Sequence, residues 1–197
     1  MTDVDPAATR REEAIVRADG SLDDTTRPRV SNGEGRYQAG EAGQRLVRIH
    51  DHLREELRQL QDAFERVMAG HSDPAVARSM INQLTMRQNY WTLGSFCASY
   101  CRVLATHHTI EDEHMFVHLK AAQETLAPVL GRLEQEHEII AAALSRLDAA
   151  LVEMIQDPAR LDGVHRAVEL LADMLLSHLD YEESELVAPI DRLGLQI

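Results

Sequence analysis

Residues 127–155 read APVLGRLEQEHEIIAAALSRLDAALVEMI, and this stretch decides the fold. Apolar residues recur in it at alternating spacings of three and four, which is the period of one face of an α-helix. Such a face is stable only when other helices cover it. The stretch therefore predicts one helix of a bundle. The inward positions are Leu130, Leu133, His137, Ile140, Leu144, Leu147, Leu151 and Met154.

The same helical period extends from residue 43 almost to the end of the chain. No stretch alternates polar and β-branched residues as a strand would. Four long helices with short links favour an all-α, up-down-up-down four-helix bundle spanning residues 43–197. An extra short helix, starting at Asp73-Pro74, separates the first two long helices. The predicted helices cover residues 43–69, 74–84, 90–120, 127–155 and 161–188, with a break near 86–90.

Residues 1–42 differ in composition from this body. They are rich in acidic residues, arginine and glycine, and they contain few large apolar side chains. Such a segment buries too little surface to offset the entropy lost on ordering. We therefore predict a disordered acidic tail over 1–42, which leaves room for a short helix over 7–18. A partner-binding arm is the alternative.

Charge and hydropathy limit the partners. The chain has 33 acidic and 20 basic residues, for a formal net charge of −13, which disfavours nucleic acid and anionic membrane surfaces. No apolar run reaches the roughly 18 residues of a membrane-spanning helix. We expect a soluble, cytoplasmic protein and leave a homodimer open. The two cysteines, Cys97 and Cys101, fit small core residues better than a redox pair.

Histidines occupy the inward positions of all four long helices. They are His50, His107, His137 and His178, and Glu111 and Glu182 follow His107 and His178 by one turn. In antiparallel pairs of helices, these positions meet at one height along the bundle. Burying two unpaired carboxylates would cost several kcal/mol each, and no Lys or Arg lies inward on these faces to pair them. One or two bound cations would resolve the charge, and imidazole with carboxylate suits iron, manganese or zinc.

Some neighbouring side chains leave alternatives open. His52 could replace His50 as the ligand of the first helix, because helix rotation read from sequence is soft. His108 could join His107, although it points about 100° away. Tyr100 could lie near the metals or be a core phenol. His114 and His118 continue the inward face beyond Glu111 and fit either a supporting role or ordinary packing.

These motifs resemble the hemerythrin-like (HHE cation-binding) domains over about residues 44–192. The resemblance rests on IHDHLR at 49–54, HHTIED at 107–112, EH at 136–137 and HLDYEE at 178–183. It implies a four-helix bundle with a non-haem centre of two iron ions. It also implies that His50, His107, His137 and His178 are terminal ligands and that Glu111 and Glu182 bridge the two irons. The resemblance further implies an oxo or hydroxo group as an additional bridge between the irons.

Two departures from the family pattern bear on function. Oxygen-carrying members have a second histidine four residues after the first on the third helix, where this chain has Ala141. They also have an aspartate five residues after the fourth-helix histidine, whereas Glu182 follows His178 by four. The chain thus resembles bacterial members that are not oxygen carriers. An oxygen or tyrosine ligand, or an open coordination position, could replace the missing imidazole.

The leading functional hypothesis is a di-iron protein that reacts with hydrogen peroxide, dioxygen or nitric oxide, with catalase- or peroxidase-like activity as its enzymatic form. An iron- or oxygen-sensing module without turnover is the alternative. Metal storage or structural binding is a third reading. All three readings predict the same metal ligands.

Overall fold

The computed structural model describes residues 15–30, 37–72 and 100–195. Its main elements are α2 (Glu41–Ser72), α4 (Phe116–Ala122), α5 (Ala127–Gln156) and α6 (Leu161–Leu193). Residues 100–110 are helical and run through η3 (Glu111–Met115), one turn of π-helix, into α4. Short 3-10 turns complete the order: η1 (Asp24–Thr26), η4 (Glu124–Leu126) and η5 (Pro158–Arg160).

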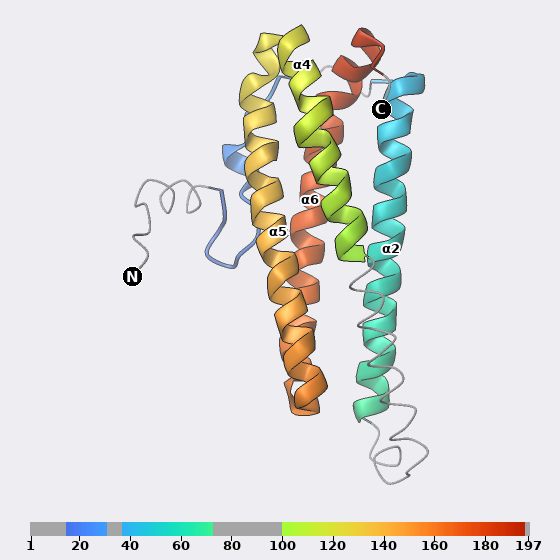
Figure 1. Cartoon of the computed structure of the whole chain (residues 1–197), viewed down its shortest axis with the longest axis vertical. Coiled ribbons are helices and arrows are strands. Elements are labelled where there is room, and N and C mark those ends of the chain that lie inside the picture. The colour runs from blue at the N-terminus through green and yellow to red at the C-terminus, as the bar shows by residue number, and fades with distance from the viewer. Residues whose placement is uncertain (1–14, 31–36, 73–99, 196–197) are drawn as a thin grey trace.

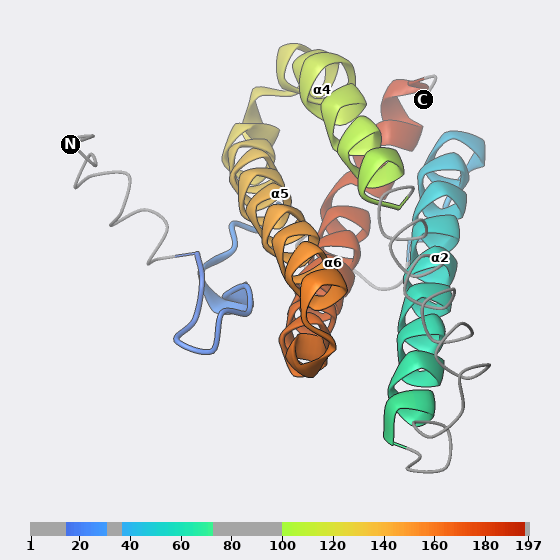
Figure 2. The same cartoon turned by 60° about the horizontal axis from the view of Figure 1, so that its bottom comes forward.

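Four helical rods lie side by side along the long axis of the molecule (Figure 1). Helix α6 packs against both α2 and α5, and the rod formed by residues 100–122 closes the fourth side (Figure 2). The described residues contain no strand, only an isolated bridge between Val16 and Leu22. The predicted all-α four-helix bundle is therefore confirmed. The expected helix over 74–84, the break near 86–90 and Cys97 lie outside the described residues.

The apolar core has two parts, one toward each end of the bundle. Each rod contributes to both, for example Leu46 and Leu53 on α2, or Leu133 and Ile140 on α5. The inward histidines fall between these two parts on every rod. The sequence therefore places a polar layer in the middle of the bundle, with apolar side chains above and below it.

The π-turn η3 corrects one sequence expectation. A regular α-helix would keep His114 and His118 on the inward face, but both are exposed, and Met115, Phe116 and Leu119 are buried instead. A π-turn has one more residue than an α-turn, so every later side chain rotates relative to the earlier ones. His118 Nδ1 lies 2.6 Å from the carbonyl oxygen of His114.

Helix α6 also runs further than expected. It passes through Pro189 and ends at Leu193, five residues beyond the predicted end at Ala188. Gly194 then adopts the left-handed conformation (φ 61°) that commonly ends a helix, and its N–H bonds back to the carbonyls of Asp191 and Ile190. The proline removes one backbone donor, but the packing of Ile190 in the core holds the helix together.

Residues 15–30, here called the N-terminal strap, differ from the disorder expected for the tail. The strap lies against α5 and α6, on the side of the bundle away from α2 (Figures 1 and 2). Ile15 and Leu22 are buried in the core, and the Tyr181 hydroxyl donates to the Pro28 carbonyl at 2.7 Å. Two apolar anchors and a few polar contacts thus offset the ordering entropy that composition alone suggested would prevail. No helix in the described part of the chain is long and apolar enough to cross a membrane.

Candidate metal centre

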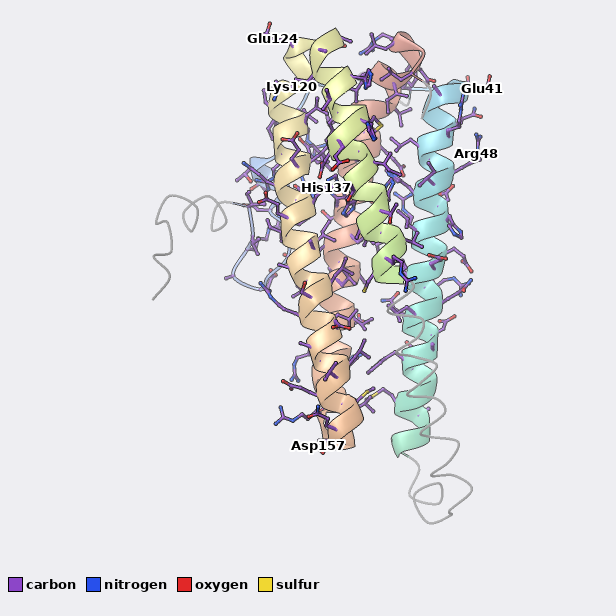
Figure 3. All side chains as sticks on the ribbon, in the orientation of Figure 1. Glu41, Arg48, Lys120, Glu124, His137 and Asp157 are labelled. Carbon is purple, nitrogen blue, oxygen red and sulfur yellow. The ribbon has the colours of Figure 1, made fainter. Side chains whose placement is uncertain are left out.

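Seven side chains from all four rods meet in the polar layer. The set contains every residue predicted from the sequence, and His108 joins it. His50 lies on α2, His107 and His108 on the helix over 100–110, Glu111 on η3, His137 on α5, and His178 and Glu182 on α6. All are buried except His107, which is nearly so. Figure 3 labels His137 on α5, beside the rod formed by residues 100–122.

The donor atoms form two groups, each compact enough for one metal ion. One group is His50, His107, Glu111 and Glu182, and the other is His108, His137 and His178; within each, the donor atoms lie within 4.8 Å of one another. In the first group, His107 Nε2 is 3.1 Å from Glu111 Oε1. In the second, His137 Nε2 is 3.1 Å from His178 Nε2. Metal–nitrogen bonds of about 2.0–2.1 Å place neighbouring ligands at about such separations.

The two glutamates of the first group also face the histidines of the second. Glu111 directs Oε1 toward His50 and His107, at 3.9 and 3.1 Å, while its Oε2 is 3.6 Å from His137 Nε2. Glu182 Oε2 is 3.5 Å from His50 Nε2 and 3.8 Å from His178 Nε2. Each carboxylate therefore faces nitrogens of both groups, as a carboxylate bridging two cations would.

Carboxylates hold the far nitrogens of three of the histidines. His50 Nδ1 is 2.9 Å from Glu183 Oε1, His137 Nδ1 is 2.8 Å from Asp112 Oδ1, and His178 Nδ1 is 3.1 Å from Glu136 Oε2. A carboxylate accepts a hydrogen bond, so each of these Nδ1 atoms carries a proton. In a neutral ring, Nε2 then presents a lone pair to the centre. The Nε2 lone pairs of His137 and His178 then face each other, an arrangement that a cation between them would stabilise.

Several buried donor atoms lack a partner inside the protein. Within the described residues, the site atoms of this kind are His50 Nε2, His107 Nε2, His108 Nε2 and both carboxylate oxygens of Glu111 and of Glu182. An unpaired buried polar atom is costly, and a buried carboxylate more so. Cations would satisfy all of these atoms at once, so the residues present fit a metal centre.

The pKa shifts reflect this burial and crowding. Burial, together with the neighbouring histidines, lowers the pKa of His107 to about 3. Burial and the charge of Glu182 raise the pKa of Glu111 well above its usual value. Burial alone would lower the pKa of His50, but nearby glutamates outweigh it and raise this pKa to about 9. Without metal, the site is an electrostatically strained cluster.

The structure also separates the alternatives left open by the sequence. His52 is 65% exposed and pairs with Glu56 on the surface, so His50 is the histidine of α2 that faces the centre. Tyr100 packs in the apolar core, and its hydroxyl lies 3.5 Å from the Leu53 carbonyl. Cys101 is half-buried with a free thiol whose pKa burial raises.

The helical wheel directed His108 about 100° away from His107, but the structure places it among the donors of the second group. Its ring stacks on that of His137 at 4.0 Å between centroids, so it supplies a third imidazole to the group of His137 and His178. A wheel takes one inward direction for each helix, but two adjacent groups can receive two successive side chains 100° apart. The absence of a histidine at Ala141 was a sequence signal of an incomplete ligand set, but the expected replacements were an oxygen or tyrosine ligand or an open position, not His108.

Fold and site together define a helical bundle with a buried histidine and carboxylate cluster suited to cations. The family model of the hemerythrin HHE cation-binding domain matches residues 41–190, and the chain belongs to this family. The bundle is thus a cation-binding domain of the hemerythrin type. No curated protein and no solved structure matched significantly.

Proposed function

We propose that this protein holds two iron ions and reacts with a small oxidant, namely hydrogen peroxide, dioxygen or nitric oxide. The observation that carries the proposal is the pair of nitrogen groups with Glu111 and Glu182 facing both of them. His108, His137 and His178 would hold one ion, and His50 and His107 the other, with both carboxylates shared. Imidazole with carboxylate suits iron, and the absence of a thiolate in the set argues against a structural zinc site.

Two bound irons would supply reversible electron transfer to the oxidant. The protein's own donors number fewer than six for each ion, so positions remain for a small molecule. The two apolar core clusters on either side of the layer limit water and exclude larger substrates. Asp112, Glu136 and Glu183 hold protons on the Nδ1 atoms of three histidines, and this fixes the orientation of those rings.

A sensor without turnover is the second candidate, and one observation favours it. The N-terminal strap lies outside the family-matched residues and contacts Glu136, which bonds to His178. A change at the metals could therefore alter a segment on the surface. Catalase- or peroxidase-like turnover is the enzymatic form of the first proposal. The cytoplasmic location expected from the sequence stays a prediction, and a homodimer stays open.

Metal content and the visible spectrum of protein purified without added metal test the proposal. We expect about two irons per chain, with near-ultraviolet bands of oxo-bridged iron. The double variant His107→Ala/His178→Ala, which removes one imidazole from each group, should lose the metal. Full iron occupancy in this variant would overturn the assignment of the ligands. A single zinc without a spectrum in the unaltered protein would overturn the di-iron reading.

Peroxide addition then distinguishes enzyme from sensor. Saturable peroxide consumption that is lost in the double variant would support catalase-like or peroxidase-like turnover. Slow consumption without saturation, together with a change of stability or oligomeric state on metal loading, would support the sensor instead.

A further inference from the structure

Arg27 of the N-terminal strap is a buried cation outside the family-matched residues 41–190. Its side chain is 3% exposed, and it forms a two-point contact with Glu136: Nε donates to Oε1 at 2.8 Å and Nη2 donates to Oε2 at 2.9 Å. Its Nη1 also donates to the backbone carbonyl and the hydroxyl of Ser177, both at 3.0 Å. Arg27 therefore ties α5 to α6 at the level of the metal centre.

Glu136 links Arg27 to His178, because it contacts both side chains. Its Oε2 is shared between Arg27 Nη2 and His178 Nδ1, while its Oε1 is shared between Arg27 Nε and Arg132 Nε. Without Arg27, the carboxylate would keep one arginine contact, on Oε1, and could pivot about it. The oxygen that orients His178 would then lose its second donor.

The strap holds Arg27 in place from both sides. Toward the N-terminus, Ile15 and Leu22 are buried in the core. Toward the C-terminus, the Pro28 carbonyl accepts from the Tyr181 hydroxyl, and the Val30 N–H donates to Glu185 Oε2 at 2.7 Å. The guanidinium of Arg27 lies 4.6 Å from the centroid of the Tyr181 ring.

The orientation of His178 depends on its carboxylate partner, Glu136, more than the orientations of His50 and His137 depend on Glu183 and Asp112. The carboxylates that hold His50 and His137 belong to Glu183 and Asp112, which are 22% and 37% exposed and in reach of water. Glu136 is fully buried, so only protein groups can keep it charged and aligned.

We propose that Arg27 is a positioning residue of the metal centre: it fixes Glu136 so that His178 keeps its proton on Nδ1 and directs Nε2 at the metal. This inference rests on the proposed metal function. It makes the N-terminal strap, which lies outside the family-matched region, a working part of the site. Arginine suits the task because its planar fork grips both carboxylate oxygens, which a lysine cannot do.

The test compares Arg27→Met with Arg29→Met in the full chain. Arg29 is a matched control, because it lies two residues along the same strap and also over the Tyr181 ring, but pairs with Glu185 rather than Glu136. Metal affinity is measured by competition with a chromophoric chelator. We expect Arg27→Met to weaken binding about 10–100-fold and Arg29→Met to leave it within about threefold.

Nitrogen-15 NMR of the histidine rings in metal-free protein gives a second readout. In the unaltered chain, His178 should carry its proton on Nδ1. In Arg27→Met, a mixture of tautomers is expected at His178 but not at His50 or His137. Arg27→Lys, which keeps the charge but not the two-point grip, should fall between the two and serves if Arg27→Met does not fold.

The outcomes separate this inference from the proposed function. If the unaltered chain binds metal and Arg27→Met and Arg27→Lys bind it equally well with an unchanged His178 tautomer, Arg27 is only structural and the inference fails. If the unaltered chain binds no metal, the proposed function fails and this inference fails with it. Equal weakening in the Arg27→Met and Arg29→Met variants would also overturn it, because the effect would then belong to the strap as a whole.

Discussion

His108 and His114 lie on the same helical rod but in opposite environments, and His114 falls within the π-turn η3. His108 is buried against His137, whereas His114 faces solvent. Three nitrogens in the group of His108, His137 and His178 give a cation a complete face of ligands, and two would hold it more weakly.

The change His108→Ala should therefore lower metal content from about two ions toward about one per chain, because it removes a ligand of one group only. His114→Ala is the matched control and should leave metal content unchanged. Metal analysis after dialysis against a weak chelator gives the answer. Equal metal content in both variants would remove His108 from the ligand set.

Protonation of the site should limit the stability of the metal-free protein at low pH. Burial lowers the pKa of His107 to about 3 and also lowers the pKa of His108 and His178 below the usual 6.5. Below pH 6.5 the unfolded chain binds protons at these residues that the folded chain does not. The free energy of unfolding should therefore fall as the pH falls from 6.5 toward 3. The raised pKa of Glu111 has the opposite effect on the free energy of unfolding, but it is one group, whereas three histidines have lowered pKa values.

At high pH the same protein should lose stability through His50. Burial acts to lower its pKa, but the surrounding glutamates raise it to about 9, so its stabilising charge is present below pH 6.5 and lost as the pH rises through 9. Urea unfolding of chelator-treated protein at about pH 5, 7 and 9 should show a maximum near neutral pH. A stability that rises steadily to pH 9 would contradict this assignment.

At the scale of elements, the N-terminal strap depends on its apolar anchors. Leu22 is 3% exposed and packs in the core although it lies outside the matched domain. The change Leu22→Ala should lower the free energy of unfolding by about 2–4 kcal/mol, from lost burial and the cavity left behind. Leu176→Ala, at a 40% exposed position on α6, is the control and should cost much less. Urea denaturation measures both, and equal costs would mean that the strap is not anchored by Leu22.

For the whole molecule, the buried carboxylates that would bind metal also lower the stability of the metal-free protein. Glu111 is a buried carboxylate whose oxygens have no donor among the described residues, and Glu182 lies beside it. The change Glu111→Gln should raise the stability of metal-free protein by about 1–4 kcal/mol, because a neutral amide replaces the buried acid. The same change should weaken metal binding, because the bridging charge is lost.

The exposed Glu113→Gln, two residues away, is the control and should alter neither quantity. Thermal unfolding with and without metal, together with chelator competition, reports both effects. A Glu111→Gln variant that is less stable without metal would show that Glu111 is satisfied within the protein and would weaken the case for a bridging role.

The sequence alone determined the bundle and most of its centre. The 3.6-residue period set the helices, and a histidine at the inward position of each one, such as His137 among leucines, could only meet the others in the middle. This inference works because an amphipathic face has one direction in which it can be buried. It favoured His50 over His52 on the first helix but left that choice open, and the structure shows His50 buried and His52 exposed.

Only the tertiary structure decided what depends on contacts between distant segments. The π-turn at Glu111–Met115 turns His114 and His118 outward, and no local residue pattern announces that extra residue. His108 enters the centre because two groups of donors lie side by side. The strap is held by the buried side chains of Ile15 and Leu22 and by the contact of Arg27 with Glu136. Arg27 and Glu136 are more than 100 residues apart in the sequence. Composition measures how much a segment can bury, whereas a few well-placed contacts across the fold determine whether it does.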